Sequence, residues 1–165
     1  MPKVVMRKAK HSDLEAITEI YNDAILKTTA TFDTQTKSME EQEKWFAAHD
    51  EKHPIIVAEI SGKVVGWASL SRWSDRCAYS GTAENSVYVA EKNRGMGIGN
   101  ALLEKLMEEG KKCGLHTVIA RIASGNGVSV KMHEKAGFSH IGTMKEVGVK
   151  FGKLLDVIMM QKIYD

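Results

Sequence analysis

Short apolar stretches rich in β-branched residues alternate along this chain with segments of helical spacing. Such stretches are typical of strands, and they predict seven strands, at residues 4–7, 55–60, 64–70, 82–89, 117–122, 138–147 and 154–162. Apolar residues three or four apart predict helices at about residues 14–26, 39–49, 98–113 and 128–135. Hairpin-linked strands followed by strand–helix–strand units predict an α/β fold, in which a mixed sheet carries helices on both faces.

Local signals sharpen several of these elements. Ser12 followed by Glu15 matches a capping box for the first helix, and Ser38 is expected to cap the second. We expect Trp45 to be a buried anchor of the second helix, together with Phe46. Two lysines near the last predicted turn, Lys150 and Lys153, are expected to be solvated.

Composition limits the classes of function. The chain has 165 residues and a formal charge of +2, which predicts one domain over residues 1–165 and argues against a general nucleic-acid binder. Cys77 and Cys113 stand alone and the histidines lack metal-binding spacing, so we expect neither a disulfide nor a metal. No apolar run is long enough for a membrane span or a signal sequence, and we therefore expect a cytoplasmic location without membrane association.

A glycine-rich turn joins the strand predicted at 82–89 to the helix predicted at 98–113. Gly95, Gly97 and Gly99 lie where a helix begins, and backbone N–H groups there can bind phosphate or pyrophosphate. A tight turn that needs positive φ explains the glycines equally well. The turn lacks the G-x-G-x-x-G spacing of dinucleotide-binding folds and the Lys-Ser/Thr pair of nucleotide-binding loops.

Three segments together indicate a family. Arg94, Gly97 and Gly99 match the pattern R-x-x-G-x-G, and a second segment runs from Asn126 through Ser129 and His133 to Gly137-Phe138. The third is T-A-E-N-S-V-Y-V at residues 82–89. They resemble the GNAT superfamily of N-acetyltransferases and, within it, the phosphinothricin acetyltransferase branch.

The resemblance covers essentially the whole chain. It implies the GNAT fold, whose central sheet of about seven strands is mostly antiparallel. Residues 149–156, V-K-F-G-K-L-L-D, are similar to branch members that acetylate methionine sulfoximine and methionine sulfone.

The resemblance also implies acetyl-CoA as the acetyl donor. Backbone amides of the turn would hold its pyrophosphate, the strand before the turn would pair with its pantetheine arm, and Asn126 would hydrogen-bond that arm. Tyr88 alternates away from its two neighbours on the strand, so core packing is the alternative for this side chain. The implied donor-binding residues are Val87, Tyr88, Val89, Arg94, Gly95, Met96, Gly97, Ile98, Gly99, Asn100, Asn126 and Ser129.

Two side chains are expected to carry the chemistry. Glu84 suits a general base that takes a proton from the attacking amine, directly or through water. His133 suits an acid that protonates the leaving thiolate near neutral pH. The alternatives are a surface position for Glu84, and for His133 a packing or helix-capping role or simple contact with CoA.

The acceptor site is expected in the segment before Glu84. Arg72 and Arg76 could hold the carboxylate of an amino acid, because a guanidinium fork matches a carboxylate. The resemblance adds Phe32, Tyr79 and Thr82 as acceptor-binding residues. The phosphinothricin enzymes carry histidines near the final hairpin where this chain has Phe151 and Leu155, which favours methionine sulfone or sulfoximine over phosphinothricin.

The sequence therefore predicts an N-acetyltransferase for the α-amine of a small L-amino-acid analogue. The resemblance also implies a homodimer, although no residue pattern in the sequence marks the interface. A different acceptor, such as a peptide N-terminus, a polyamine or an aminoglycoside, is the first alternative. A non-catalytic CoA-binding module is the second.

Overall fold

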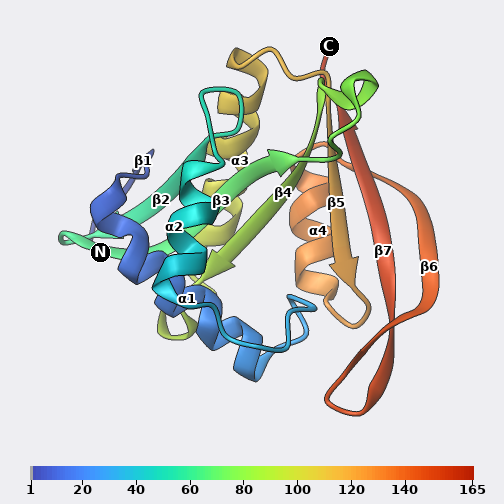
Figure 1. The fold of residues 1–165 in the computed structure, drawn as a ribbon, viewed down its shortest axis with the longest axis horizontal. Helices are drawn as coiled ribbons and strands as arrows, with labels where there is room; N and C mark the ends of the chain where they lie inside the picture. The colour runs from blue at the N-terminus through green and yellow to red at the C-terminus, as the bar shows by residue number, and fades with distance from the viewer. Residues whose placement is uncertain (1) are drawn as a thin grey trace.

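The apolar runs form the strands of one seven-stranded sheet in a computed structural model, which describes residues 2–165 (Figure 1). The strand order is β1-β2-β3-β4-β5-β7-β6. The strands are β1 (Val4–Lys8), β2 (Ile55–Ile60), β3 (Lys63–Arg72), β4 (Thr82–Val89), β5 (Thr117–Ala123), β6 (Ser139–Lys150) and β7 (Lys153–Ile163). Four α-helices accompany them: α1 (Leu14–Lys27), α2 (Met39–Ala47), α3 (Ile98–Lys112) and α4 (Gly127–Lys135).

Strand direction confirms the predicted mixed sheet. Every neighbouring pair is antiparallel except β4 and β5, which run parallel. That parallel ladder is short, because it joins only Thr82–Glu84 to Thr117–Ile119. Beyond Glu84 the two strands continue without pairing to each other, and the sheet splits at its centre.

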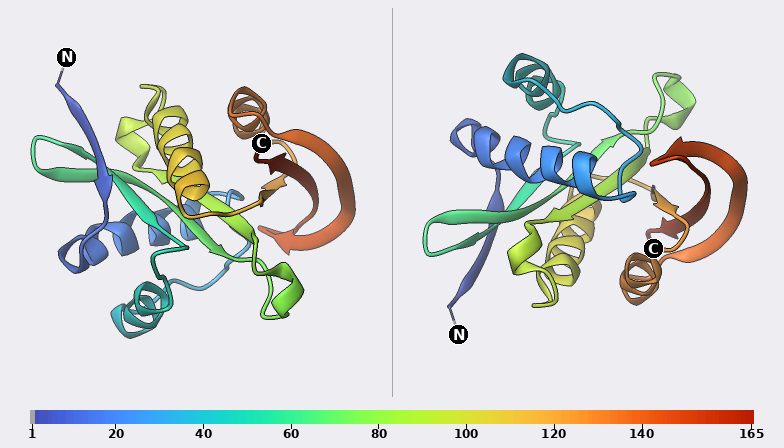
Figure 2. Two further views of the ribbon diagram at one scale, coloured as in Figure 1. Left: turned by 90° about the horizontal axis from the view of Figure 1, so that it is seen from above. Right: turned by 90° about the horizontal axis from the view of Figure 1, so that it is seen from below.

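Helices cover both faces, as the pattern predicted. Figure 2 shows α1 and α2 on one face of the sheet and α3 and α4 on the other. Under α3 lies the larger core cluster, which includes Leu102, Leu106 and Met160, all fully buried. Under α1 lies a smaller cluster around Ile17 and Trp67. Burial on both faces stabilises the central strands through the hydrophobic effect.

The capping predictions had mixed outcomes. Ser38 forms its capping box with Glu41, as the N–H of each residue donates to the side chain of the other. The capping box of Ser12 and Glu15 was wrong, because Ser12 lies inside the short 3-10 helix η1 (His11–Asp13) and α1 starts only at Leu14. Asp13 marks this helix start instead: its carboxylate accepts from Lys10 N–H at 2.7 Å and from Arg7 at 2.7 and 2.9 Å.

The last hairpin also departs from expectation. β6 runs to Lys150, and the turn is formed by Phe151 and Gly152, which both have positive φ. Lys150 was expected in solvent but is buried, with 4% of its surface exposed, and its Nζ donates to Thr31 O at 2.8 Å. The turn directs the lysine back onto the loop after α1. Lys153 is exposed, as expected.

Within residues 2–165, no helix is both long and apolar enough to cross a membrane. The same residues contain no cluster of three His, Cys, Asp or Glu side chains that could hold a metal ion.

Candidate active site

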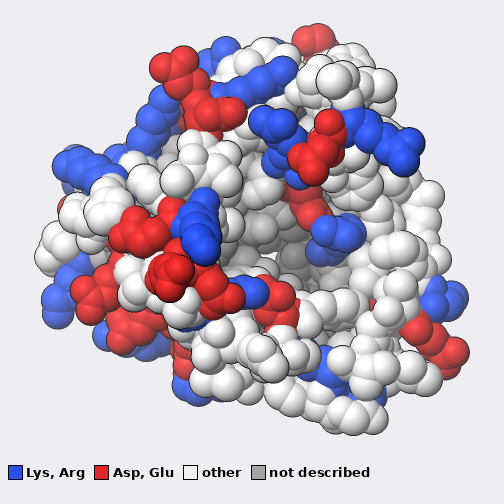
Figure 3. All heavy atoms as spheres, in the orientation of Figure 1, with Lys and Arg blue, Asp and Glu red and all other residues white. Residues whose placement is uncertain are grey.

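A pocket of about 400 Å³ occupies the split between β4 and β5. Its walls come from the diverging strands, from α4, from the loop after α1 and from the β6–β7 hairpin. Figure 3 shows the same face of the molecule hollowed near its centre, with charged side chains of both signs around the hollow. Because the split leaves backbone groups of both strands without strand partners, a ligand of extended shape could pair with them.

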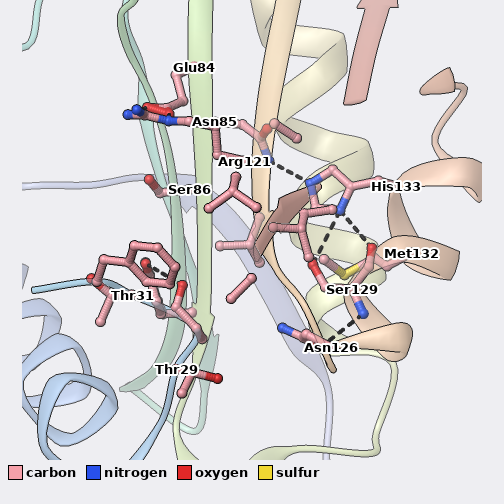
Figure 4. Close-up of a pocket in the computed structure, with 18 of the residues that line it drawn as sticks. Thr29, Thr31, Glu84, Asn85, Ser86, Arg121, Asn126, Ser129, Met132 and His133 are labelled. Carbon is pink, nitrogen blue, oxygen red and sulfur yellow. Dashed lines mark hydrogen bonds and ion pairs between the residues drawn. The ribbon is translucent and has the colours of Figure 1, made fainter. Parts of the chain in front are cut away.

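An ion pair lies in this pocket, at the point where the strands separate. Glu84 is the last residue of β4 paired with β5, and Arg121 follows two residues after its partner Ile119. Arg121 Nε and Nη2 donate to the two Glu84 oxygens, each at 2.6 Å (Figure 4). The Glu84 contact is the first cause that raises the pKa of Arg121 above its ordinary value. Bidentate contacts between a guanidinium and a carboxylate are among the stronger hydrogen-bonded pairs in proteins.

A second pair, Asn85 and His133, is buried deeper in the same pocket. His133 Nδ1 lies 2.7 Å from Ser129 O, and a carbonyl can only accept, so Nδ1 carries a proton. Nε2 then has a lone pair and accepts from Asn85 Nδ2 at 3.0 Å. Burial lowers the pKa of His133, which favours this neutral tautomer. Asn85 Oδ1 has no partner among the described residues.

The glycine turn has the geometry that an anion site needs. Gly95 and Gly97 both have positive φ, and a Cβ at either position would meet nothing within 4 Å. Gly97 is the N-cap of α3, whose first turn carries neither a side-chain cap nor an acidic residue. Its first N–H groups therefore have no intrahelical acceptor and lie at the positive end of the helix dipole. An approaching pyrophosphate would meet backbone donors on an open surface.

The remaining residues of the turn have structural contacts as well. Arg94 is exposed, and its Nε donates to Val89 O at 3.1 Å, which ties the turn to the end of β4. Gly99 faces Met132 of α4, because a Cβ there would lie 3.2 Å from Met132 Sδ. Ile98 is buried in the core, whereas Met96 and Asn100 are exposed.

Helix α4 begins at the floor of the pocket. Asn126 Oδ1 accepts from Ser129 N–H at 3.3 Å and so caps the helix. The amide nitrogen of Asn126 has no protein partner among residues 2–165, and the side chain lines the pocket (Figure 4). Asn126 can therefore cap α4 with its side-chain oxygen and, at the same time, donate its amide N–H to a ligand.

The loop after α1 closes one side of the pocket. The Tyr21 hydroxyl forms a hydrogen bond with the Thr31 hydroxyl at 3.0 Å and also donates one to the Asp33 carboxylate. Burial, followed by the Asp33 contact, raises the pKa of Tyr21. Phe32 lines the pocket and lies against Gly148 of β6, where any side chain would overlap its ring. With Lys150 holding Thr31 O, the hairpin fixes the loop in place.

The pocket unites many of the residues that the sequence predicted. Both candidate catalytic residues line it, and so do several candidate binding residues: Phe32, Val87, Tyr88, Asn126 and Ser129. Tyr88 also packs between aromatic rings, 5.1 Å from the ring centres of Tyr21 and Trp67, so its core role is observed too.

Four predicted acceptor residues do not line the pocket. Arg72 is the last residue of β3, and Arg76 and Tyr79 are exposed in the loop that follows it. Thr82 begins β4 on the paired side of the split, opposite Thr117. The turn at residues 94–100 and Val89 also lie outside the pocket walls.

Two pocket residues were missed by sequence reasoning. Arg121 is the exposed member of an otherwise buried strand, and this break in the apolar pattern was visible in the sequence. Asn85 is a polar residue at a buried strand position, 9% exposed. The sequence could not reveal which residue each of them contacts, because the partners lie 37 and 48 residues away along the chain.

The arrangement combines a glycine turn with free backbone N–H groups, a split sheet and a carboxylate beside a small pocket. Such a site can hold a phosphorylated, extended donor along the split and take a proton from a group that enters the pocket.

Comparison with known proteins agrees with this geometry. The family model for the acetyltransferase (GNAT) domain matches residues 6–159. An L-methionine sulfoximine/L-methionine sulfone acetyltransferase from Salmonella typhimurium is 38% identical over 159 residues, 96% of this chain and 93% of that protein.

Solved structures share the fold throughout. A ribosomal-protein-alanine N-acetyltransferase from Brucella melitensis is 40% identical with a TM-score of 0.94, covering 97% of this chain and 99% of that one. A phosphinothricin acetyltransferase from Sinorhizobium meliloti, solved in complex with acetyl-CoA, is 34% identical with a TM-score of 0.94, covering 97% of this chain and 88% of that one. The chain belongs to the GNAT family of N-acetyltransferases.

Proposed function

We propose that this enzyme transfers the acetyl group of acetyl-CoA to the α-amine of a small L-amino-acid analogue of the methionine sulfoximine, methionine sulfone or phosphinothricin type. The observation that carries the proposal is the carboxylate of Glu84 at the mouth of a small pocket, beside a strand split that suits an extended donor. The names of the similar proteins from Salmonella and Sinorhizobium support this acceptor class.

The donor would bind along the split. Backbone N–H groups from Arg94 to Asn100 would hold the pyrophosphate, supported by the start of α3. The backbone of Val87 and Val89, which has no strand partner on the side of the split, would pair with the pantetheine arm as with an added strand. Asn126 would donate its free amide N–H to the same arm, and Ser129 would line it.

Glu84 would act as the base. An amino acid arrives with an ammonium group, and the Glu84 carboxylate takes one of its protons, so that the nitrogen gains a free electron pair. This nitrogen forms a bond to the thioester carbon, and the C–S bond breaks with its electron pair on sulfur. The nitrogen loses a second proton, the thiolate gains one, and Glu84 releases its proton to solvent.

His133 would position the site. In the tautomer that these contacts imply, Nε2 has no proton to give to a thiolate, so we assign it the role of holding Asn85 at the pocket wall. The acid role of His133 stays a prediction, because it requires a proton at the atom that faces Asn85. A thiolate is a weak enough base to leave with modest help from an acid.

Phe32 would form the apolar side of the acceptor pocket, where the methionine-like side chain fits. Roles for Arg72, Arg76, Tyr79 and Thr82 stay predictions. Phe151 is exposed at the hairpin turn and Leu155 is buried. Because both side chains are apolar, neither supplies a polar group for a phosphinate.

Release of free thiol tests the proposal. The enzyme is incubated with acetyl-CoA and, in turn, methionine sulfone, methionine sulfoximine, phosphinothricin, spermidine and a peptide with N-terminal alanine. The last substrate matters because the Brucella relative is named for ribosomal-protein alanine. We expect acetylation of the amino-acid analogues at a kcat/KM at least tenfold above the peptide. Preference for the peptide or the polyamine would assign the acceptor otherwise, and no release with any amine would leave a CoA-binding module.

We also propose a homodimer and a cytoplasmic location. β6 has a free edge in the sheet, and Val147, Val149 and Leu154 on the β6–β7 hairpin are more than half exposed. Apolar side chains on an edge strand favour a second copy as the covering partner. Light scattering at micromolar concentration should give the mass of two chains, and Val149→Lys should reduce it to one.

A further inference from the structure

Arg121 is the charged side chain of the pocket that the reaction described above does not use. It is the only arginine or lysine among the residues that form the pocket walls within the described chain. The two arginines that the sequence suggested for an acceptor carboxylate, Arg72 and Arg76, are exposed and do not line the pocket. Among the described residues, Arg121 is therefore the cation in the pocket wall that could pair with an acceptor carboxylate.

The contact with Glu84 leaves part of the guanidinium available. Nε and Nη2 donate to Glu84, and Nη1 has no hydrogen-bond partner among residues 2–165. The side chain is 52% exposed, whereas that of Glu84 is 21% exposed, so the guanidinium lies on the outer side of the pair. Trp73, which follows β3, packs its ring 5.6 Å from Arg121 Cζ and restrains the guanidinium plane.

The ion pair also matches the charge pattern of an amino acid. In an α-amino acid the ammonium and the carboxylate are attached to the same carbon, so a receptor must place its anion and its cation next to each other. Glu84 and Arg121 do so, with N–O distances of 2.6 Å. We propose that Arg121 binds the α-carboxylate of the acceptor while Glu84 binds its α-amine, so that the pair selects zwitterionic substrates over simple amines.

This inference rests on the proposed function and adds an event to it. When the acceptor carboxylate pairs with the guanidinium fork, Arg121 no longer holds both oxygens of Glu84. Glu84 is thereby released from its strongest partner at the moment when the ammonium arrives. Only an acceptor that carries a carboxylate can cause this exchange.

The test compares two substrates that differ only at the carboxylate. Methionine sulfone and its carboxamide are assayed with the wild-type enzyme, Arg121→Gln, Arg121→Lys and Arg76→Gln. For Arg121→Gln we expect kcat/KM for methionine sulfone to fall about 10- to 100-fold, the range for a lost charged hydrogen bond. The value for the carboxamide should change less than about threefold, since that substrate never used the fork. Arg121→Lys should recover part of the loss, and Arg76→Gln should leave the ratio of the two substrates unchanged.

The ratio separates the inference from a structural role. If Arg121 only supports Glu84, both substrates lose activity equally in Arg121→Gln, and the inference is overturned. A selective loss in Arg76→Gln would instead assign the carboxylate to the loop after β3. If the wild-type enzyme acetylates neither compound, the proposed function itself fails. Thermal melting of each variant confirms that the losses do not come from unfolding.

Discussion

The two halves of the candidate site differ in the groups that form them: one uses backbone atoms and the other uses side chains. The turn proposed to bind the donor, at residues 94–100, is made of backbone: two glycines with positive φ and the free N–H groups at the start of α3. The pocket proposed to bind the acceptor is made of side chains from distant segments, above all Glu84 with Arg121 and Asn85 with His133. Backbone sites can be recognised in a contiguous stretch of sequence, whereas side-chain sites require the tertiary structure.

The largest effect is expected from a substitution of Glu84, the proposed base in the side-chain half of the site. Glu84→Gln keeps the size of the side chain and one of the two acceptor oxygens that face Arg121, but it cannot take a proton. We expect kcat to fall about 10²- to 10³-fold, within the usual range for a general base. Calorimetry should find acetyl-CoA affinity within about twofold of the wild type. An unchanged kcat would remove Glu84 from the base role.

The donor turn is tested by a glycine substitution with a matched control. Gly97→Ala places a Cβ on a backbone with φ of 80°, and Gly62→Ala does the same at φ of 79° in the β2–β3 turn. Both should lower the free energy of unfolding by about 1–2 kcal/mol. Only Gly97→Ala should weaken acetyl-CoA binding, by about tenfold, because its backbone would face the pyrophosphate. Equal affinities in the two variants would contradict a donor role for the turn.

A substitution at Gly148 should displace the Phe32 ring from the pocket wall without changing any polar side chain of the pocket. A side chain at Gly148 would overlap the Phe32 ring, whereas one at Gly142 of the same strand would meet nothing within 4 Å. Gly148→Ala should therefore raise the KM for the amino-acid acceptor about three- to tenfold, and Gly142→Ala should not. Steady-state kinetics at saturating acetyl-CoA measures both. A normal acceptor KM in Gly148→Ala would mean that Phe32 does not contact the acceptor.

The smallest expected effect concerns the protonation of His133. Burial lowers its pKa below the ordinary value of 6.5, so the unfolded chain binds more protons than the folded chain just below that pH. The contribution of His133 is therefore complete above pH 6.5 and is lost on acidification, by at most about 1.4 kcal/mol per pH unit.

Urea unfolding at several values between pH 7.5 and pH 5 measures this effect. His133→Gln should show a shallower loss of stability than the wild type. His49, whose pKa burial also lowers, is present in both proteins and cancels in the comparison. Parallel curves would show that the pKa of His133 does not differ between the folded and unfolded states, which would contradict the lowering by burial.

Much of the fold followed from the sequence because its signals are local. The strands predicted at 55–60 and 82–89 have the observed bounds, and the helix predicted at 98–113 ends one residue earlier. These elements depend on periodicity and on glycine stops within a few residues. The Ser12 capping box failed because Asp13 is drawn to Arg7 across the start of α1, a contact that a capping pattern does not contain.

The sequence predicted only part of the pocket between β4 and β5. The resemblance suggested Glu84 and His133 as catalytic residues, and both line the pocket, but it did not reveal that Arg121 contacts Glu84 and Asn85 contacts His133. Lys150 illustrates the same limit: a lysine beside a hairpin turn is normally solvated, yet this one is buried because the turn places it over Thr31. Sequence pattern indicates which way a strand residue points, and the facing residue is known only once the strands are paired.

The short ladder between β4 and β5 has a consequence for the cooperativity of the fold. The sheet consists of two ribbons, β1–β4 and β5–β7, whose strand pairing meets only in the short ladder at Thr82–Glu84. Each ribbon presents an inner edge to the pocket, and amides on these edges are open to hydrogen exchange without unfolding of either ribbon. A donor that pairs with these edges would join the two ribbons, and we therefore expect donor binding to protect the edge amides from exchange and to stiffen the sheet.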